Sequence, residues 1–157
     1  IGTAAHELGH ALGFFHTHSR YDRDQFITVD EQNIKPPGCG AELEATKEWK
    51  PLVDDLGDRK AGLTPREDLM KCNYWIKAPA GKKIEVKFVD FPDGIAVDGC
   101  TYAGVEIKTH PDQHRTGYRF CSKDDANTVL KSLSNLVPVI TYNRIYATIT
   151  KLEYRYV

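Results

Sequence analysis

The sequence lacks long apolar runs and has no large excess of charge of either sign. No run of apolar residues is long enough to cross a bilayer, and the mean hydropathy is −0.47, so we expect no membrane span. The 21 basic and 22 acidic residues leave a formal net charge of −1. This balance argues against a nucleic-acid-binding protein and against a polybasic membrane surface.

Cysteine is scarce but even in number. The four cysteines, Cys39, Cys72, Cys100 and Cys121, contain no C-x-x-C pair, so a cysteine-based zinc site is not expected. An even count favours disulfides formed in an oxidising compartment, and four cysteines allow three pairings. Four free thiols in a cytosolic protein would be the alternative.

The sequence also lacks an initial Met, a signal-peptide pattern and an N-x-S/T sequon. Residue 1 is Ile, and a motif begins a few residues later. We therefore interpret the chain as a fragment or mature piece, and we do not expect N-glycosylation.

A metal-binding pattern stands near the start of the chain. His6 and His10 are four residues apart, which places two imidazoles on one face of a helix, and Glu7 lies beside them. Gly13 can end the helix, and His16 can return as a third ligand. Three histidines with one open position are typical of a catalytic zinc site, in which the glutamate is the general base. We therefore predict a Zn²⁺ site with an N-terminal helix.

The complete spacing is the H-E-x-x-H-x-x-G-x-x-H pattern that marks metzincins. The following residues resemble the astacin family of zinc endopeptidases, and the matching segments are Ser19-Arg20, Asp22-Arg23-Asp24 and Asn33-Ile34. The resemblance implies that His6, His10 and His16 are zinc ligands and that Glu7 is catalytic. Thr17 departs from the family, because many astacins have Glu there and pair it with the mature N-terminus.

The rest of the chain predicts β-structure. Residues 35–38, Lys-Pro-Pro-Gly, break regular structure and give our domain boundary, with 1–36 as a partial catalytic segment and 39–157 as a second domain. Residues 43–56 look helical or irregular. Short alternating segments separated by turns then favour a β-sandwich. We expect these strands at 74–76, 83–89, 105–108, 118–121, 136–142 and 147–157, with Pro138 marking an edge or a bulge.

This second part resembles a CUB domain, an extracellular antiparallel sandwich found beside astacin catalytic domains. The resemblance rests on Cys72 with Trp75-Ile76, on Pro79–Lys83, Ile84–Phe88, Asp98–Cys100 and Tyr118–Cys121, and on residues 132–139. It implies the sequential disulfides that we also favour, Cys39–Cys72 and Cys100–Cys121. Many CUB domains bind calcium through an Asp where this chain has Ala103, so we do not predict calcium.

The astacin resemblance is incomplete. The family has a Met-turn, Ser-x-Met-His-Tyr, below the zinc, whereas the single Met here, Met70, precedes Lys71-Cys72. We expect a secreted zinc metalloendopeptidase, truncated and nematode-like, that cleaves a protein or peptide substrate and contacts protein partners through its CUB-like domain. The alternative is a non-catalytic extracellular CUB interaction module with a vestigial zinc helix.

Overall fold

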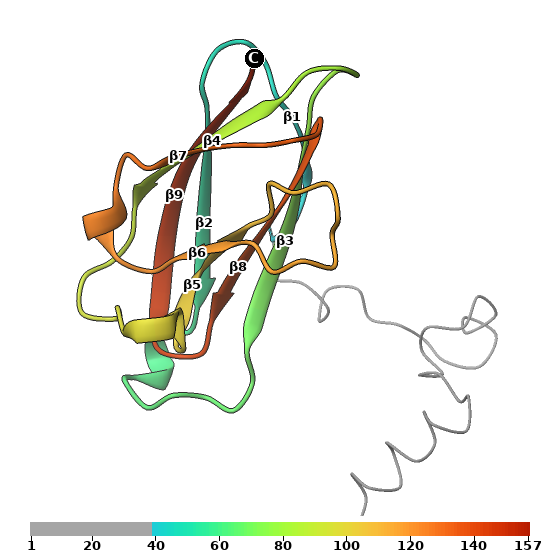
Figure 1. Cartoon of the computed structure of the whole chain (residues 1–157). Coiled ribbons are helices and arrows are strands. Elements are labelled where there is room, and N and C mark those ends of the chain that lie inside the picture. Colours follow the sequence, from blue (N-terminus) through green and yellow to red (C-terminus); the bar gives the residue numbers. More distant parts are fainter. Residues whose placement is uncertain (1–38) are drawn as a thin grey trace, which may run out of the picture. The chain divides into compact units, whose positions relative to one another are not determined.

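Nine strands form two facing sheets in residues 39–157, the part of the chain that the computed structural model describes (Figure 1). The five-stranded sheet has the order β1 (Glu42–Glu44), β3 (Met70–Lys77), β8 (Leu136–Asn143), β5 (Ala103–Ile107), β6 (Tyr118–Phe120). The four-stranded sheet has the order β2 (Lys50–Gly57), β9 (Ala147–Tyr156), β4 (Ile84–Asp90), β7 (Val129–Lys131). The predicted mainly-β sandwich is confirmed, whereas the predicted zinc helix lies outside the described residues.

The core lies between the sheets and follows from alternation along the strands. Successive side chains of a strand point to opposite faces, and in β3 every second residue, Cys72, Tyr74 and Ile76, is buried. Phe88 of β4 stacks on Phe120 of β6 with ring centroids 5.1 Å apart. This aromatic pair joins the two sheets.

The expectation of helical or irregular structure at residues 43–56 is wrong. The structure has β1 and β2 there, and β2 is a regular strand with Leu52, Asp54 and Leu56 buried and Val53 and Asp55 exposed. Asp54 takes one of the buried positions and Val53 one of the exposed positions, the reverse of the usual apolar-inside, polar-outside alternation. The alternation was therefore hidden in the sequence.

The prediction that Pro138 marks an edge or a bulge is also wrong, because β8 lies between β3 and β5 and its register with β3 continues through Pro138 without a shift. Pro138 is opposite Trp75 of β3. The backbone N–H of Trp75 points away from β8 and donates to Ala41 O at 2.9 Å. The carbonyl of Pro138 accepts from Lys108 N at 3.0 Å, just beyond the end of β5. Pro138 lies beyond the last residue pair of β5 and β8, which is Ile107 with Val139. Its missing N–H therefore removes no bond from that ladder, and a proline is tolerated inside the sheet.

Two further elements differ from the sequence-based expectation. β1 pairs with β3 in parallel, Glu42 with Trp75 and Glu44 with Lys77, so the sandwich is not purely antiparallel. β7 was not expected, since it has only three residues, and its first and last are exposed. Both short strands lie at sheet edges.

The turn between β8 and β9 is fixed by close backbone contact with the end of β2. Gly57 has φ +117°, and a Cβ there would lie 2.3 Å from Tyr146 O. Only glycine fits this approach. The side chain of Asn143, fully buried, bonds within the same turn through Nδ2 to Ile145 O at 2.8 Å.

Candidate functional site

The predicted zinc ligands His6, His10 and His16 and the predicted base Glu7 lie outside the described residues. Their chemistry suits zinc, because neutral imidazoles are among its preferred ligands and three of them leave one position open. Within residues 39–157, no group of three or more His, Cys, Asp or Glu side chains could hold a metal ion. The metal site therefore remains a prediction from the motif.

All four cysteines form disulfides. Cys39 is bonded to Cys72 of β3, with Cα atoms 5.1 Å apart, and Cys100 is bonded to Cys121, with Cα atoms 5.6 Å apart. This is the sequential pairing. The first bridge fixes the start of the described residues to the five-stranded sheet, and the second joins the turn before β5 to the end of β6.

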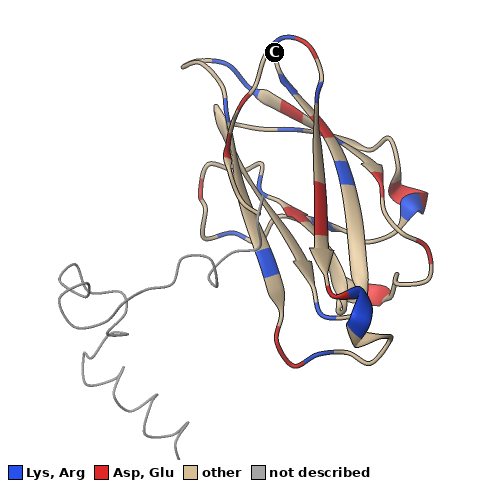
Figure 2. Ribbon diagram, turned by 180° about the vertical axis from the view of Figure 1, so that it is seen from behind, with Lys and Arg blue, Asp and Glu red and all other residues tan. Residues whose placement is uncertain are grey.

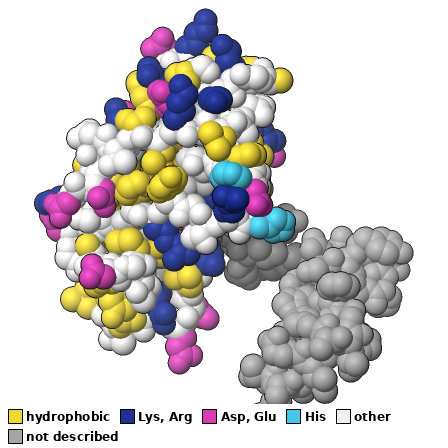
Figure 3. All heavy atoms as spheres, viewed as in Figure 1, with side chains coloured by type: hydrophobic (Ala, Val, Ile, Leu, Met, Phe, Trp, Pro, Cys, Tyr) yellow, Lys and Arg dark blue, Asp and Glu magenta, His cyan; other side chains and the backbone are white. Residues whose placement is uncertain are grey.

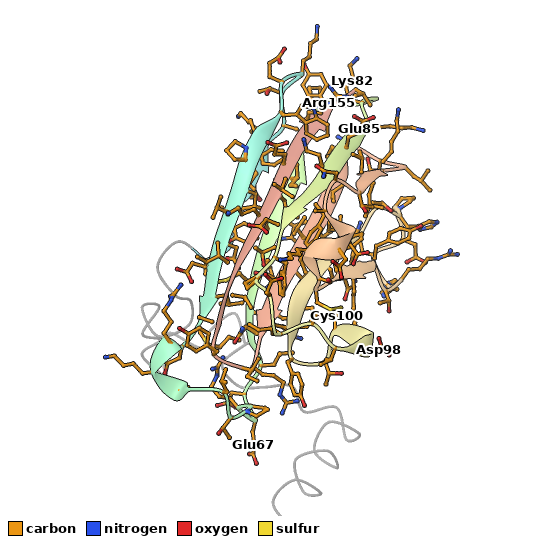
Figure 4. The ribbon with its side chains drawn as sticks, turned by 90° about the vertical axis from the view of Figure 1, so that its left-hand side faces the viewer. Glu67, Lys82, Glu85, Asp98, Cys100 and Arg155 are labelled. Atoms are coloured by element: carbon orange, nitrogen blue, oxygen red, sulfur yellow. A yellow bond between two sulfur atoms is a disulfide. The ribbon has the colours of Figure 1, made fainter. Side chains whose placement is uncertain are left out.

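The position at which many CUB domains place a calcium-binding Asp is closed to solvent here. Ala103 is the first residue of β5 and is 1% exposed. Asp98 and Glu67 come from loops at the same end of the sandwich as Cys100, and Figure 4 labels all three residues. Asp98 lies in the short 3₁₀ turn η5 (Asp98–Cys100).

The aromatic ring of Trp49 lies close to two cationic side chains beside the four-stranded sheet. The ring centroid of Trp49 lies 4.9 Å from Lys87 Nζ and 4.5 Å from Arg155 Cζ. Lys87 also pairs with Glu153, and Arg155 Nη2 lies 2.8 Å from Glu85 Oε2 (Figure 4). Both ion pairs join residues that face each other across β4 and β9. This arrangement depends on strand register, so it could not be predicted from the sequence.

A second arrangement that was not predicted from the sequence lies in the core. The hydroxyl of Tyr74 donates to Asp54 Oδ1 at 2.5 Å, and Asp54 is 4% exposed. Burial and then the bond to Asp54 raise the pKa of Tyr74 well above its ordinary value. The one signal for this hydrogen bond in the sequence is that Asp54 shares the alternating positions of Leu52 and Leu56, which are buried.

An open hollow of about 360 Å³ with several basic residues in its lining lies beside the β5–β6 and β7–β8 connections. Its lining includes Lys108, Arg115 and Lys131 with the exposed side chains of Tyr118 and Leu133. Figure 3 shows this face, where basic and histidine side chains lie next to hydrophobic ones. His110 also lines the hollow, and its Nδ1 accepts from Asp112 N at 3.0 Å.

Sequence families match both parts of the chain. Residues 1–50 match the Astacin peptidase family, and residues 61–148 match the CUB domain. The astacin match runs past the boundary that we predicted at residues 35–38 and reaches the first residue of β2.

Nematode proteins are among the curated relatives that this chain matches. Zinc metalloproteinase nas-31 of Caenorhabditis elegans is 31% identical over 99% of this chain and 43% of its own length. Zinc metalloproteinase nas-32 of the same organism is 36% identical over 76% of this chain and 19% of its own length. The chain thus spans less than half of these relatives. The nas-31 alignment covers 269 positions, against 157 residues here, so it contains long gaps in this chain.

Solved structures support the fold alone. The CUB1-EGF-CUB2 domains of rat MASP-1 superimpose with a TM-score of 0.54 at 15% identity, covering 75% of this chain and 42% of theirs. The full extracellular region of zebrafish Gpr126/Adgrg6 gives 0.51 at 20% identity, covering 76% of this chain and 15% of its own. The chain therefore belongs to the CUB domain family, and it carries N-terminal to that domain a segment of an astacin-type peptidase sequence.

Proposed function

We propose that the chain is part of a zinc-dependent metalloendopeptidase of astacin type, with His6, His10 and His16 as the metal ligands and Glu7 as the general base. The observation that carries this proposal is the full H-E-x-x-H-x-x-G-x-x-H motif inside the astacin match at residues 1–50. The names of the nematode relatives, which are zinc metalloproteinases, support the same assignment.

The ligands and the base have separate roles in hydrolysis. Zinc, when bound, would supply Lewis acidity toward the peptide carbonyl. The Glu7 carboxylate accepts a proton from the attacking water and returns it to the leaving amine. The three imidazoles must be neutral to donate to a metal, so acid is expected to release it.

The domain arrangement that we propose is a catalytic segment at 1–36 followed by the CUB domain at 39–157. We further propose secretion, because a CUB domain, astacin-type relatives and two disulfides are typical of extracellular proteins. The residues that the structure describes contain no helix long and apolar enough to cross a membrane.

Metal content and hydrolysis together test the peptidase proposal. We expect elemental analysis to find one zinc per chain and a casein substrate to be cleaved. The Glu7→Gln variant should keep the zinc and lose hydrolysis, whereas His10→Ala should lose both. Hydrolysis that is unchanged in Glu7→Gln, or a chain that never takes up zinc, would overturn the proposal.

A second function is favoured by a specific observation. The described structure is a complete sandwich with its core and both disulfides, while the nas-31 alignment has long gaps in this chain. A non-catalytic CUB module that binds a protein partner fits these facts. Zinc uptake without hydrolysis, combined with partner binding that a chelator does not alter, would favour this second function over the first.

A further inference from the structure

The connection between β2 and β3 presents two adjacent basic residues to solvent. Arg59 and Lys60 lie in the one-turn 3₁₀ helix η4 (Arg59–Ala61), which Figure 2 shows in blue at the lower end of the sandwich. The side chains from Asp58 to Leu69 are exposed or half-exposed, and Leu63 reaches 75% exposure. Exposed loops with small and polar residues are the preferred places for proteolytic nicking.

The backbone of this connection is hydrogen-bonded to the β8–β9 turn at Asp58 and at Arg66. Asp58 N donates to Tyr146 O at 2.8 Å, and Arg66 N donates to Arg144 O at 2.6 Å. Between them, Lys60 N donates to Asp58 Oδ1 at 2.8 Å and Ala61 N to Asp58 O at 3.2 Å. A protease binds its substrate in extended form, so two solvent-exposed hydrogen bonds must open for the turn to enter an active site.

Of the three basic side chains here, two are engaged. Arg59 Nη2 donates to both carboxylate oxygens of Asp55, at 2.8 and 2.9 Å. Arg66 Nη2 donates to Asn143 Oδ1 at 2.6 Å. Lys60 makes no side-chain hydrogen bond or ion pair with any residue that the structure describes. It is therefore the side chain that is free to enter the acidic specificity pocket of a trypsin-like enzyme.

A second dibasic pair in the same domain is protected. Lys82 and Lys83 are exposed in the β3–β4 turn, but Lys83 N donates to Val157 O at 3.2 Å and Lys83 O accepts from Val157 N at 2.8 Å. Lys82 Nζ also lies 5.8 Å from the ring centroid of Tyr156. Figure 4 labels Lys82 at the end of the sandwich opposite Glu67 of the β2–β3 connection. The two pairs share chemistry and differ in backbone restraint.

The products of a cut in the β2–β3 connection would not separate. The disulfide between Cys39 and Cys72 has one cysteine before this connection and the other after it. β1 stays paired with β3, and β2 keeps its eight register pairs with β9. A break at this point removes chain continuity and leaves both ladders in place.

We propose that the Lys60–Ala61 bond is a processing site for a serine endopeptidase that requires a basic residue before the scissile bond. Water adds across the amide, leaving a carboxylate on Lys60 and an amine on Ala61. The product is a two-chain molecule, residues 1–60 and 61–157, joined by Cys39–Cys72. This inference is independent of peptidase activity in residues 1–36.

Limited digestion of the folded full chain with trypsin tests the proposal. We expect the first cut within residues 39–157 to give Ala61 as the new N-terminus. Electrophoresis should show one band without reductant and two with it. Cuts before Cys39 have their own N-terminal sequences and are scored separately. Circular dichroism of the cut protein should match that of the intact protein.

Two matched double variants locate the site. Arg59→Gln/Lys60→Gln should lose the cut, and Lys82→Gln/Lys83→Gln should keep it at the wild-type rate. The proposal is overturned when another bond in residues 39–157, such as one at Lys82 or Lys83, is cut first. It is also overturned when the two products separate without a reductant.

Discussion

The phenol of Tyr74 and the carboxylate of Asp54 form a hydrogen bond between the two sheets. Tyr74 belongs to β3 of the five-stranded sheet and Asp54 to β2 of the four-stranded sheet, and the donor–acceptor distance is 2.5 Å. The second carboxylate oxygen of Asp54, Oδ2, is buried and has no partner among the residues that the structure describes. The buried acid therefore depends on this one phenol.

Replacing Tyr74 with Phe should destabilise the domain. The variant leaves both oxygens of a buried carboxylate without a donor, and an unsatisfied buried polar group costs about 1–3 kcal/mol. Urea unfolding followed by tryptophan fluorescence measures the loss. Tyr154→Phe is the matched control, because Tyr154 is 4% exposed and its hydroxyl makes no hydrogen bond within residues 39–157. Equal losses in the two variants would mean that the bond to Asp54 contributes nothing.

The domain should lose stability in alkali. Burial raises the pKa of Tyr74, Tyr142 and Tyr154 above the ordinary value of about 10. Below that pH the phenols are protonated in both states, so their contribution is fully present. Above it the unfolded chain releases protons that the folded chain retains, and unfolding becomes more favourable. Urea unfolding on both sides of this pH should show the fall, with a smaller slope in Tyr74→Phe. A free energy of unfolding that stays constant would contradict the prediction.

Removing either disulfide should cost stability. The bridges close loops with sequence separations of 33 and 21 residues. Because the entropy of loop closure grows only slowly with length, each loss should lie in the same range of about 2–5 kcal/mol. Thermal unfolding of Cys39→Ser/Cys72→Ser and of Cys100→Ser/Cys121→Ser measures the two losses. A variant as stable as the wild type would show that its bridge does not constrain the unfolded chain.

A chelator should affect the predicted metal site and leave the stability of the β-sandwich unchanged. EDTA and a zinc-selective chelator are expected to abolish any casein hydrolysis and to leave the melting temperature of the CUB domain unchanged. A ligand that binds only the folded state raises its stability, so a calcium site would show itself as a higher melting temperature after calcium is added. Such a rise would contradict our expectation from Ala103.

The strands that could be predicted from the sequence are those whose pattern is unambiguous. Ile84, Val86 and Phe88 alternate with polar residues, and this strand lies where it was expected as β4. β2 could not be predicted because Asp54 takes a core position that only the partner hydroxyl of Tyr74, twenty residues later, makes tolerable. Local pattern contains no information about such a long-range bond.

Other differences have the same origin. From the sequence alone, Pro138 indicates an edge or a bulge. The residue at which β5 ends depends on strand pairing and cannot be recognised within the β8 sequence. The proximity of two cations to Trp49 depends on the register that sets Glu85 opposite Arg155. The zinc motif, in contrast, is a short-range pattern that could be identified from the sequence, and its geometry remains a prediction.

The short outer strands have a consequence for self-association. β1, β6 and β7 each have three residues, and β1 carries Glu42 and Glu44 along the margin of the five-stranded sheet. β2 is the long exception, and Pro51 removes one of its amide donors. Edge strands that are short, carry acidic side chains or lack a backbone N–H donor are poor templates for pairing with a strand of a second chain. We therefore expect the described domain to resist edge-to-edge aggregation.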